Sequence, residues 1–110
     1  MQKVSVEPSL SSQSVVRRHA AAFHAPVHDE LVVTQGEKDS YFRLDATGKR
    51  IWELLESPTT VGELCDVLAR EYNVERSTLN KEVMAFLAHL EQQELVEIEQ
   101  STVAKYPYQV

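Results

Sequence analysis

The sequence predicts an α+β fold in which a three-stranded antiparallel sheet is followed by three helices. Residues 23–44 contain three short runs rich in β-branched and aromatic residues, separated by polar turns. From residue 45 to residue 93, apolar residues instead recur at the three- and four-residue spacing of amphipathic helices. The pattern changes within Tyr41–Leu55, so we expect this stretch to join the sheet to the helices.

The three predicted strands are Phe23–Val27, Glu30–Thr34 and Ser40–Leu44, which connect most simply as a meander. The first carries Pro26, which has no N–H to donate and is tolerated at a sheet edge. The third strand has no proline, so its outer N–H and C=O groups are free to pair with an added strand. This open edge is the main functional feature that the sequence predicts.

The predicted helices are Ala46–Glu56, Val61–Tyr72 and Thr78–Gln93. Each has a candidate N-cap, and we expect these caps to be Asp45, Thr60 (in a capping box with Glu63) and Ser77. A short strand or wing is expected at Leu95–Glu99. The helical part is therefore expected to form a winged-helix-like three-helix bundle.

The third helix is expected to bury Leu79, Val83, Phe86 and Leu90, with Leu87 at the margin of this stripe. Asn80, Met84 and Ala88 follow one flank of the stripe. Methionine is adaptable and alanine permits close approach, so this flank could form one wall of a groove. The alternative is that Met84 and Leu87 are ordinary core residues.

The chain of 110 residues is expected to form one domain at residues 23–99, with an N-terminal arm at 1–22 and a C-terminal tail at 100–110. Residues 1–10 could form a loose arm or an added strand, and residues 11–22 could hold a short helix or stay extended. No apolar run reaches the roughly 18 residues of a membrane span, and residues 1–7 lack the apolar core of a signal peptide. The lone Cys65 agrees with a reducing compartment, so the expected location is the cytoplasm, away from membranes.

The charge distribution argues against nucleic-acid binding. The net charge is −6, and residues 45–99 hold five Lys or Arg against twelve Asp or Glu. Proteins that bind nucleic acids use Lys and Arg to neutralise phosphates. A winged-helix DNA-binding transcription regulator therefore remains only as the alternative function. Its recognition helix would present Arg76, Ser77, Thr78, Asn80 and Lys81.

No catalytic, metal or cofactor site is expected. His24 and His28 could share one face of a strand, but only Asp29 is close to them as a further ligand, so zinc is disfavoured. Cys65 lies between apolar residues of a helical pattern, which favours a buried structural thiol over a nucleophile. The three glycines include no phosphate-binding loop. We therefore expect a protein that is not an enzyme.

The order of these motifs resembles the PqqD family, whose members are leader-peptide recognition domains (RiPP recognition elements) of ribosomally made and modified peptides. The strand ending in Leu44-Asp45 leads through Gly48 into Ile51-Trp52-Glu53-Leu54-Leu55. The similarity continues through Thr59–Leu64, Glu71–Val74, Val83–Leu90 and Glu94–Ile98. It covers residues 32–99, which is most of the chain.

The resemblance implies a peptide chaperone that binds the leader of a precursor peptide by strand addition and delivers it to a leader peptidase or other modifying enzyme. Free-standing relatives serve lasso peptide biosynthesis, where leaders often carry a Tyr-x-x-Pro pattern. An open edge can also pair with a second copy, so a homodimer remains an option. The implied peptide-binding residues are Ser40, Tyr41, Phe42, Arg43, Leu44, Asn80, Lys81, Met84, Leu87 and Ala88.

Overall fold

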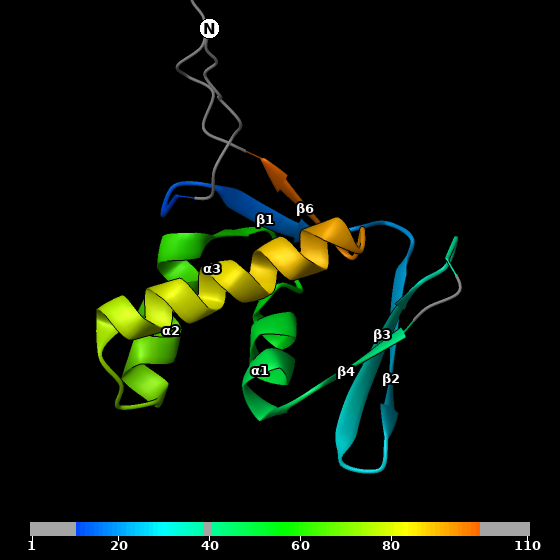
Figure 1. Ribbon diagram of the computed structural model, residues 1–110, viewed down its shortest axis with the longest axis horizontal. Coiled ribbons are helices and arrows are strands. Elements are labelled where there is room, and N and C mark those ends of the chain that lie inside the picture. Colours follow the sequence, from blue (N-terminus) through cyan, green and yellow to red (C-terminus); the bar gives the residue numbers. More distant parts are fainter. Residues whose placement is uncertain (1–10, 39–40, 100–110) are drawn as a thin grey trace, which may run out of the picture.

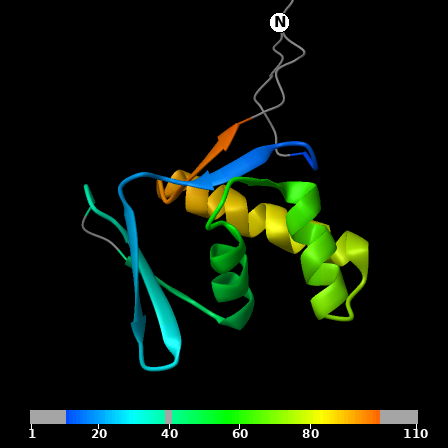
Figure 2. The same cartoon turned by 180° about the vertical axis from the view of Figure 1, so that it is seen from behind.

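The computed structural model describes residues 11–38 and 41–99, and it has an α+β fold with two three-stranded antiparallel sheets and three helices. One sheet, formed within residues 22–44, lies to one side of the first helix, and the second sheet, formed by residues 15–18, 59–60 and 96–99, lies across one end of the helices (Figures 1 and 2). No helix in the described part of the chain is long and apolar enough to cross a membrane.

The sheet β2-β3-β4 consists of Ala22–Val27, Glu30–Gln35 and Tyr41–Leu44, close to the strands expected from the sequence. Leu31 pairs with Leu44 and Val33 with Phe42, so these four side chains share the inner face. Leu31, Val33 and Leu44 are buried, and Phe42 packs partly buried against the same core. The hydrophobic alternation therefore fixes the register of the sheet.

The sheet β5-β1-β6 was not expected, although its strand β6 lies within the short strand predicted at Leu95–Glu99. Its central strand β1 is Val15–Arg18, within the predicted N-terminal arm, and it pairs with β5 (Thr59–Thr60) and β6 (Val96–Glu99). The prediction of a single sheet ahead of the helices was therefore incomplete, because the partners of β1 lie far along the chain and give no local signal. The comparison with a winged helix stays a prediction.

The three helices are Ala46–Leu54 (α1), Val61–Glu71 (α2) and Arg76–Gln92 (α3). Two of the expected caps are confirmed. The side chain of Asp45 accepts a hydrogen bond from Gly48 N at 2.8 Å, and Thr60 forms a capping box with Glu63.

The start of α3 differs from the prediction. Its N-cap is Glu75, which makes no side-chain cap hydrogen bond, and Ser77 lies inside the helix. The helix thus begins two residues before Thr78, the expected first residue. The local Ser-Thr pair resembles a cap, but the observed start puts these two residues in the first turn.

The core stripe of α3 is Leu79, Val83, Leu87 and Leu90. Leu87 is completely buried, whereas Phe86 is only partly buried at the edge of the core. The sequence interpretation had exchanged the roles of these two neighbours. Both fit a helical repeat, and only the position of β4 and α1 decides which of them lies inward.

Trp52 of α1 connects the two sheets. Its ring is buried, the guanidinium of Arg18 (β1) lies 4.7 Å from the ring centroid, and its Nε1 donates to Nδ1 of His24 (β2) at 3.1 Å. Arg18 also donates through Nη2 to the carbonyl oxygen of Trp52. One aromatic residue therefore holds the ends of β1 and β2 against α1.

The position of α1 against α2 is further fixed by a charged pair. Arg50 Nη2 donates to Glu71 Oε2 at 2.7 Å and Arg50 Nε donates to Glu71 Oε1 at 2.9 Å. These bonds from the guanidinium hold the pKa of the Glu71 carboxyl below its ordinary value. A two-point contact of this kind fixes orientation as well as distance.

Candidate functional site

The strand β4 forms one edge of its sheet, and no strand in residues 11–38 or 41–99 pairs with its outer side. Along β4, Phe42 and Leu44 face inward while Tyr41 and Arg43 face outward and are exposed. Ser40, the first residue of the predicted edge, lies outside the described residues. The described edge, residues 41–44, carries main-chain groups that can accept an added strand.

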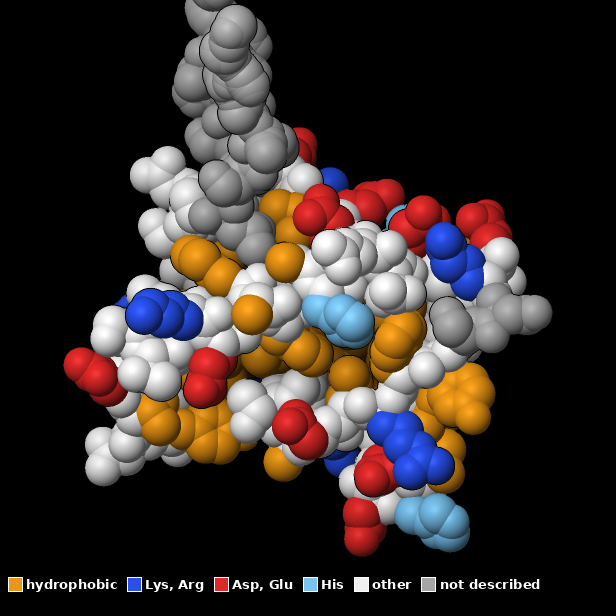
Figure 3. All heavy atoms as spheres, viewed as in Figure 1, with side chains coloured by type: hydrophobic (Ala, Val, Ile, Leu, Met, Phe, Trp, Pro, Cys, Tyr) orange, Lys and Arg blue, Asp and Glu red, His pale blue; other side chains and the backbone are white. Residues whose placement is uncertain are grey.

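The flank of α3 nearest to β4 carries Glu82, Phe86 and His89, which share one side of the helix at i, i+4 and i+7. The Phe42 and His89 rings meet edge to face with their centroids 5.5 Å apart. This contact places β4 beside α3. Figure 3 shows hydrophobic side chains gathered in the hollow below α3, between that helix and the strand.

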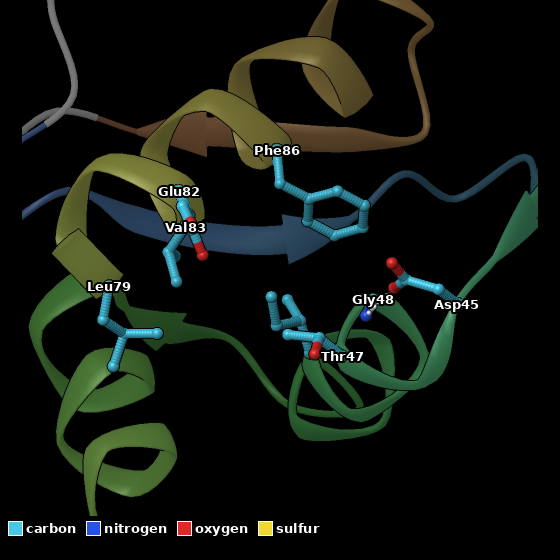
Figure 4. A pocket seen from close by; sticks show the side chains of 8 residues that line it. Asp45, Thr47, Gly48, Leu79, Glu82, Val83 and Phe86 are labelled. Atoms are coloured by element: carbon cyan, nitrogen blue, oxygen red, sulfur yellow. Dashed lines mark hydrogen bonds between the residues drawn. The ribbon is translucent and has the colours of Figure 1, made fainter. Parts of the chain in front are cut away.

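A cavity of about 210 Å³ opens in this hollow, between the first turn of α1 and the first half of α3. Its lining residues are Asp45, Thr47, Gly48, Ile51, Leu79, Glu82, Val83 and Phe86. In Figure 4 the side chains of Leu79, Glu82 and Val83 point from α3 towards α1, and the ring of Phe86 points towards Asp45. The cavity begins where β4 ends, so a strand added to β4 would pass over it.

Gly48 permits the close approach of α1 and α3 at this cavity. A Cβ atom added to Gly48 would lie 3.2 Å from Cζ of Phe86 and 3.2 Å from Oδ1 of Asp45, which is tight for both. The missing side chain therefore gives the Phe86 ring its position. The start of α1, which with Ile51 and Trp52 carries part of the family resemblance, therefore also forms one wall of the cavity.

The residues predicted on α3 lie mostly away from β4. Asn80, Met84 and Ala88 follow a flank of the core stripe opposite to that of Glu82, Phe86 and His89. Asn80 accepts a hydrogen bond from Arg76 at 3.2 Å, and Met84 packs partly buried against the core. Lys81 is exposed, and Leu87 is a core residue with no exposed surface.

The structure therefore brings Tyr41–Leu44 together with one flank of α3, and the sequence favoured the other flank. Composition suggested Met84 and Ala88 as groove residues, but composition does not say which flank faces the sheet. The candidate site that the structure outlines also contains Asp45, Glu82, Phe86 and His89, which the sequence analysis did not name as binding residues. An aromatic residue beside a continuous stripe of aliphatic residues, as at Phe86, is the signal that could have found them.

A second surface feature is the outer face of the sheet β2-β3-β4. Phe23, Val27 and Tyr41 are exposed there by 60%, 42% and 66%, which is high for large hydrophobic side chains. Val27, Val32 and Tyr41 help to line a shallow depression of about 420 Å³ on this face. An added strand on β4 would therefore have apolar surface on both of its sides.

The side chains considered above as metal ligands or nucleophiles have structural surroundings. The described residues contain no group of three or more His, Cys, Asp or Glu side chains arranged to hold a metal ion. Cys65 is buried, and this burial raises the pKa of its thiol, which disfavours the reactive thiolate. His24 accepts the Trp52 hydrogen bond and so has a structural role.

The fold and this edge-plus-helix site define a small α+β domain with the architecture of PqqD-like proteins. The family model "Coenzyme PQQ synthesis protein D (PqqD)" matches residues 30–96, more than half of the chain. The chain belongs to the PqqD family.

Solved structures agree with this assignment. TbiB1 in complex with the TbiA(beta) leader peptide is 34% identical, with a TM-score of 0.68 over 84% of this chain and 99% of that chain. Lasso peptide synthetase B1 complexed with the leader peptide is 21% identical, with a TM-score of 0.67 over 74% of this chain and 96% of that chain. A comparison with curated proteins gave no match.

A third similar structure is the PqqD truncation of Methylobacterium extorquens PqqCD. It represents a functional, stand-alone RiPP recognition element, is 20% identical and has a TM-score of 0.68 over 81% of this chain and 95% of that chain. At this identity, and at that of the lasso peptide synthetase B1, the likeness concerns the fold. It shows that the arrangement of two sheets and three helices recurs in a recognition element.

Proposed function

We propose that this protein binds the leader region of a ribosomally made precursor peptide and catalyses no reaction itself. The observation that carries the proposal is the open edge of β4 beside the cavity between α1 and α3. It is supported by the 34% identity to TbiB1, a protein whose structure holds a leader peptide.

The leader would bind by strand addition. An extended peptide laid along residues 41–44 pairs with the free main-chain groups of β4, which supplies affinity with little dependence on sequence. Successive peptide side chains then alternate between two environments. One set faces the cavity and Phe86, and the other faces the apolar outer surface around Tyr41.

The bound leader would serve to hold the rest of the precursor near a modifying or processing enzyme, such as a leader peptidase. Holding a substrate on a shared partner raises its effective concentration without any new chemistry. A lasso peptide pathway is our more specific proposal, supported by the likeness in fold to lasso peptide synthetase B1, whose structure holds a leader peptide. A location in the cytoplasm stays a prediction from the sequence.

The alternative of a winged-helix DNA-binding regulator finds no support in the relatives named above. The acidic charge of residues 45–99 also opposes it. One experiment distinguishes the two functions. Fluorescence anisotropy is measured at two salt concentrations with a labelled leader from the neighbouring small open reading frame and with a random DNA duplex.

We expect peptide binding that changes little with salt and no DNA binding. Salt-sensitive binding of the duplex without binding of the leader would overturn the proposal and favour the DNA-binding alternative.

The two flanks of α3 are then compared by Phe86→Glu and Met84→Glu. Both residues are partly buried on the same helix, so each variant adds the same charge to a similar environment. If the leader lies between β4 and α3, Phe86→Glu lowers affinity at least about tenfold and Met84→Glu changes it little. The reverse result would favour the flank of Asn80, Met84 and Ala88 as the wall of the binding groove, as the sequence predicts. Circular dichroism checks that both variants are folded.

A further inference from the structure

The cavity beside β4 is lined by both apolar and acidic side chains. Four of its lining residues are large and apolar: Ile51, Leu79, Val83 and Phe86. Its charged lining residues are both acidic: Asp45, the N-cap of α1, and Glu82 of α3. Within residues 11–38 and 41–99, no Lys or Arg lines the cavity. The cavity therefore combines an apolar interior with negative charge (Figure 4).

The carboxylate of Glu82 is available to a ligand. Glu82 is exposed, and its side chain makes no hydrogen bond or ion pair with another residue in the part of the chain that the structure describes. Asp45 uses Oδ1 to cap α1, and the positive end of that helix offsets part of its charge. Glu82 is therefore the stronger attraction for a cation.

Nearby cations of the protein itself are engaged elsewhere. Arg43 lies 3.6 Å from Glu30, and Arg50 is bonded to Glu71 and Glu53. Lys49 lines an adjoining depression that shares Asp45 with the cavity and also includes Asp29 and Glu53, so Lys49 lies on the side of Asp45 away from Glu82. Lys81 is the sequence neighbour of Glu82, but it projects about 100° away around the helix. The negative charge of the cavity is thus not neutralised by a cation that lines it.

The size of the cavity suits a single side chain. At about 210 Å³ it is smaller than the roughly 300–1,000 Å³ of small-molecule pockets. A long aliphatic stem would contact Ile51, Val83 and Phe86 while a charged end group stays near the opening. Lysine and arginine side chains have this construction, because they bury their methylene groups and keep the charge in water.

We propose that this cavity selects a leader peptide with a lysine or arginine whose side chain enters between α1 and α3 and pairs with Glu82. The inference rests on the proposed function, since it names the chemistry of one leader position at the same site. Glu82 is then a specificity-determining residue, and Asp45 reinforces its preference.

The test is a double-mutant cycle on binding of the labelled leader from the neighbouring small open reading frame. Each Lys or Arg of this peptide is changed singly to Gln and to Glu, and each peptide is measured by anisotropy against the native protein, Glu82→Gln and Glu82→Lys. The matched control is Glu91→Gln, an exposed glutamate elsewhere on α3. Cycles of this kind isolate the pairwise interaction from other effects of each change.

We expect one basic position of the leader to couple to residue 82. Its change to Gln should weaken binding about fivefold in the native protein and little in Glu82→Gln, as for a solvent-exposed ion pair. Its change to Glu should weaken binding further, and Glu82→Lys should recover part of this loss. Glu91→Gln should show no such coupling.

Two results overturn the inference while the proposed function stands. One is tight binding with no coupling between residue 82 and any basic position of the leader. The other is tight binding of a leader that contains no Lys or Arg. If the native leader does not bind the native protein at all, the proposed function itself fails, and the inference fails with it.

Discussion

The two sheets of this protein differ in how their strands are used. In the sheet β5-β1-β6 the central strand β1 is paired on both sides, and Val16 at its middle has no exposed surface. In the sheet β2-β3-β4 the last strand has a free edge, and the outer face exposes Phe23, Val27 and Tyr41. The first sheet closes the core, and the second leaves main-chain and apolar groups available to a partner.

This difference teaches how a small domain can combine stability with an open binding edge. Exposed edges invite uncontrolled pairing, so proteins usually limit them. Here Pro26 protects one outer strand of the open sheet, and β4 remains free. The inner face of β4 still packs in the core through Leu44, while β1 and Trp52 supply further contacts that hold the two sheets together.

The largest effect is expected at Trp52, because it joins both sheets. Trp52→Ala should lower the free energy of unfolding by about 3–5 kcal/mol, as for other buried aromatic residues. Trp52→Phe keeps most of the packing but loses the hydrogen bond to His24, so it should lower this free energy less. Urea unfolding followed by circular dichroism measures both. Equal stability of Trp52→Ala and the native protein would mean that the sheets are held together by other contacts.

A matched pair of proline substitutions tests the contrast between the central and the edge strand. Arg17 lies in the central strand β1 opposite Glu97 of β6, and Arg17→Pro should lower the free energy of unfolding by about 2–3 kcal/mol through a lost ladder bond and an unpaired main-chain partner. Arg43→Pro lies in the edge strand β4 and should cost less than about 1 kcal/mol while weakening leader binding.

Arg17→Ala and Arg43→Ala serve as controls for the loss of each side chain, including the ion pairs with Glu99 and Glu30. A folded Arg43→Pro that binds the leader normally would mean that the pairing with the peptide runs through other residues of β4.

A smaller change in stability is expected from Gly48→Ala. Alanine favours the helix by about 0.5–1 kcal/mol relative to glycine, but its Cβ would press on the Phe86 ring, so the net change should be below about 1 kcal/mol. Movement of the ring into the cavity should lower leader affinity severalfold. Thermal melts and anisotropy together check this expectation, and unchanged affinity would show that the leader does not use the cavity.

The smallest effect concerns the stability of the protein in acid, and it arises where β5 meets the first turn of α2. Thr59 Oγ1 donates to Glu63 Oε1 at 2.7 Å and Thr60 N donates to it at 3.2 Å, so the pKa of Glu63 lies below its ordinary value of about 4.5. The stabilisation is therefore complete above that value and is lost as the pH falls through the lower pKa of the folded protein.

Thr59→Val removes the first of these donors. It should destabilise the protein at pH 7 and have less effect at an acidic pH below the lowered pKa of Glu63, where the carboxylate that accepts the hydrogen bond is lost. Urea unfolding at the two pH values measures the difference. Glu91→Gln is the control, because the Glu91 side chain has no hydrogen bond or ion pair among residues 11–38 and 41–99. An equal effect of Thr59→Val at both pH values would contradict the assigned cause.

The features predicted well from the sequence are those that local chemistry determines. Asp45 and the Thr60–Glu63 box were found because a cap depends on residues three apart. The strands of the open sheet were found because they alternate and follow one another. The family was recognised because these signals occur in a specific order.

The features that were missed depend on contacts between distant parts of the chain. Val15–Arg18 has the composition of a short strand, but its partners are residues 59–60 and 96–99. The flank of α3 that faces β4 is likewise set by packing, since Phe86 and Met84 both lie beside the apolar stripe. Periodicity identifies the stripe and leaves the choice between its two sides to tertiary structure.

The pairing of β1 has a consequence for the order in which this chain can fold during its synthesis. Val15 pairs with Glu99, so the sheet β5-β1-β6 cannot form completely until residues 96–99 have left the ribosome. The strands β2, β3 and β4 pair with close neighbours in sequence and can form much earlier. The newly made chain would therefore expose the open edge of β4 before its hydrophobic core is complete.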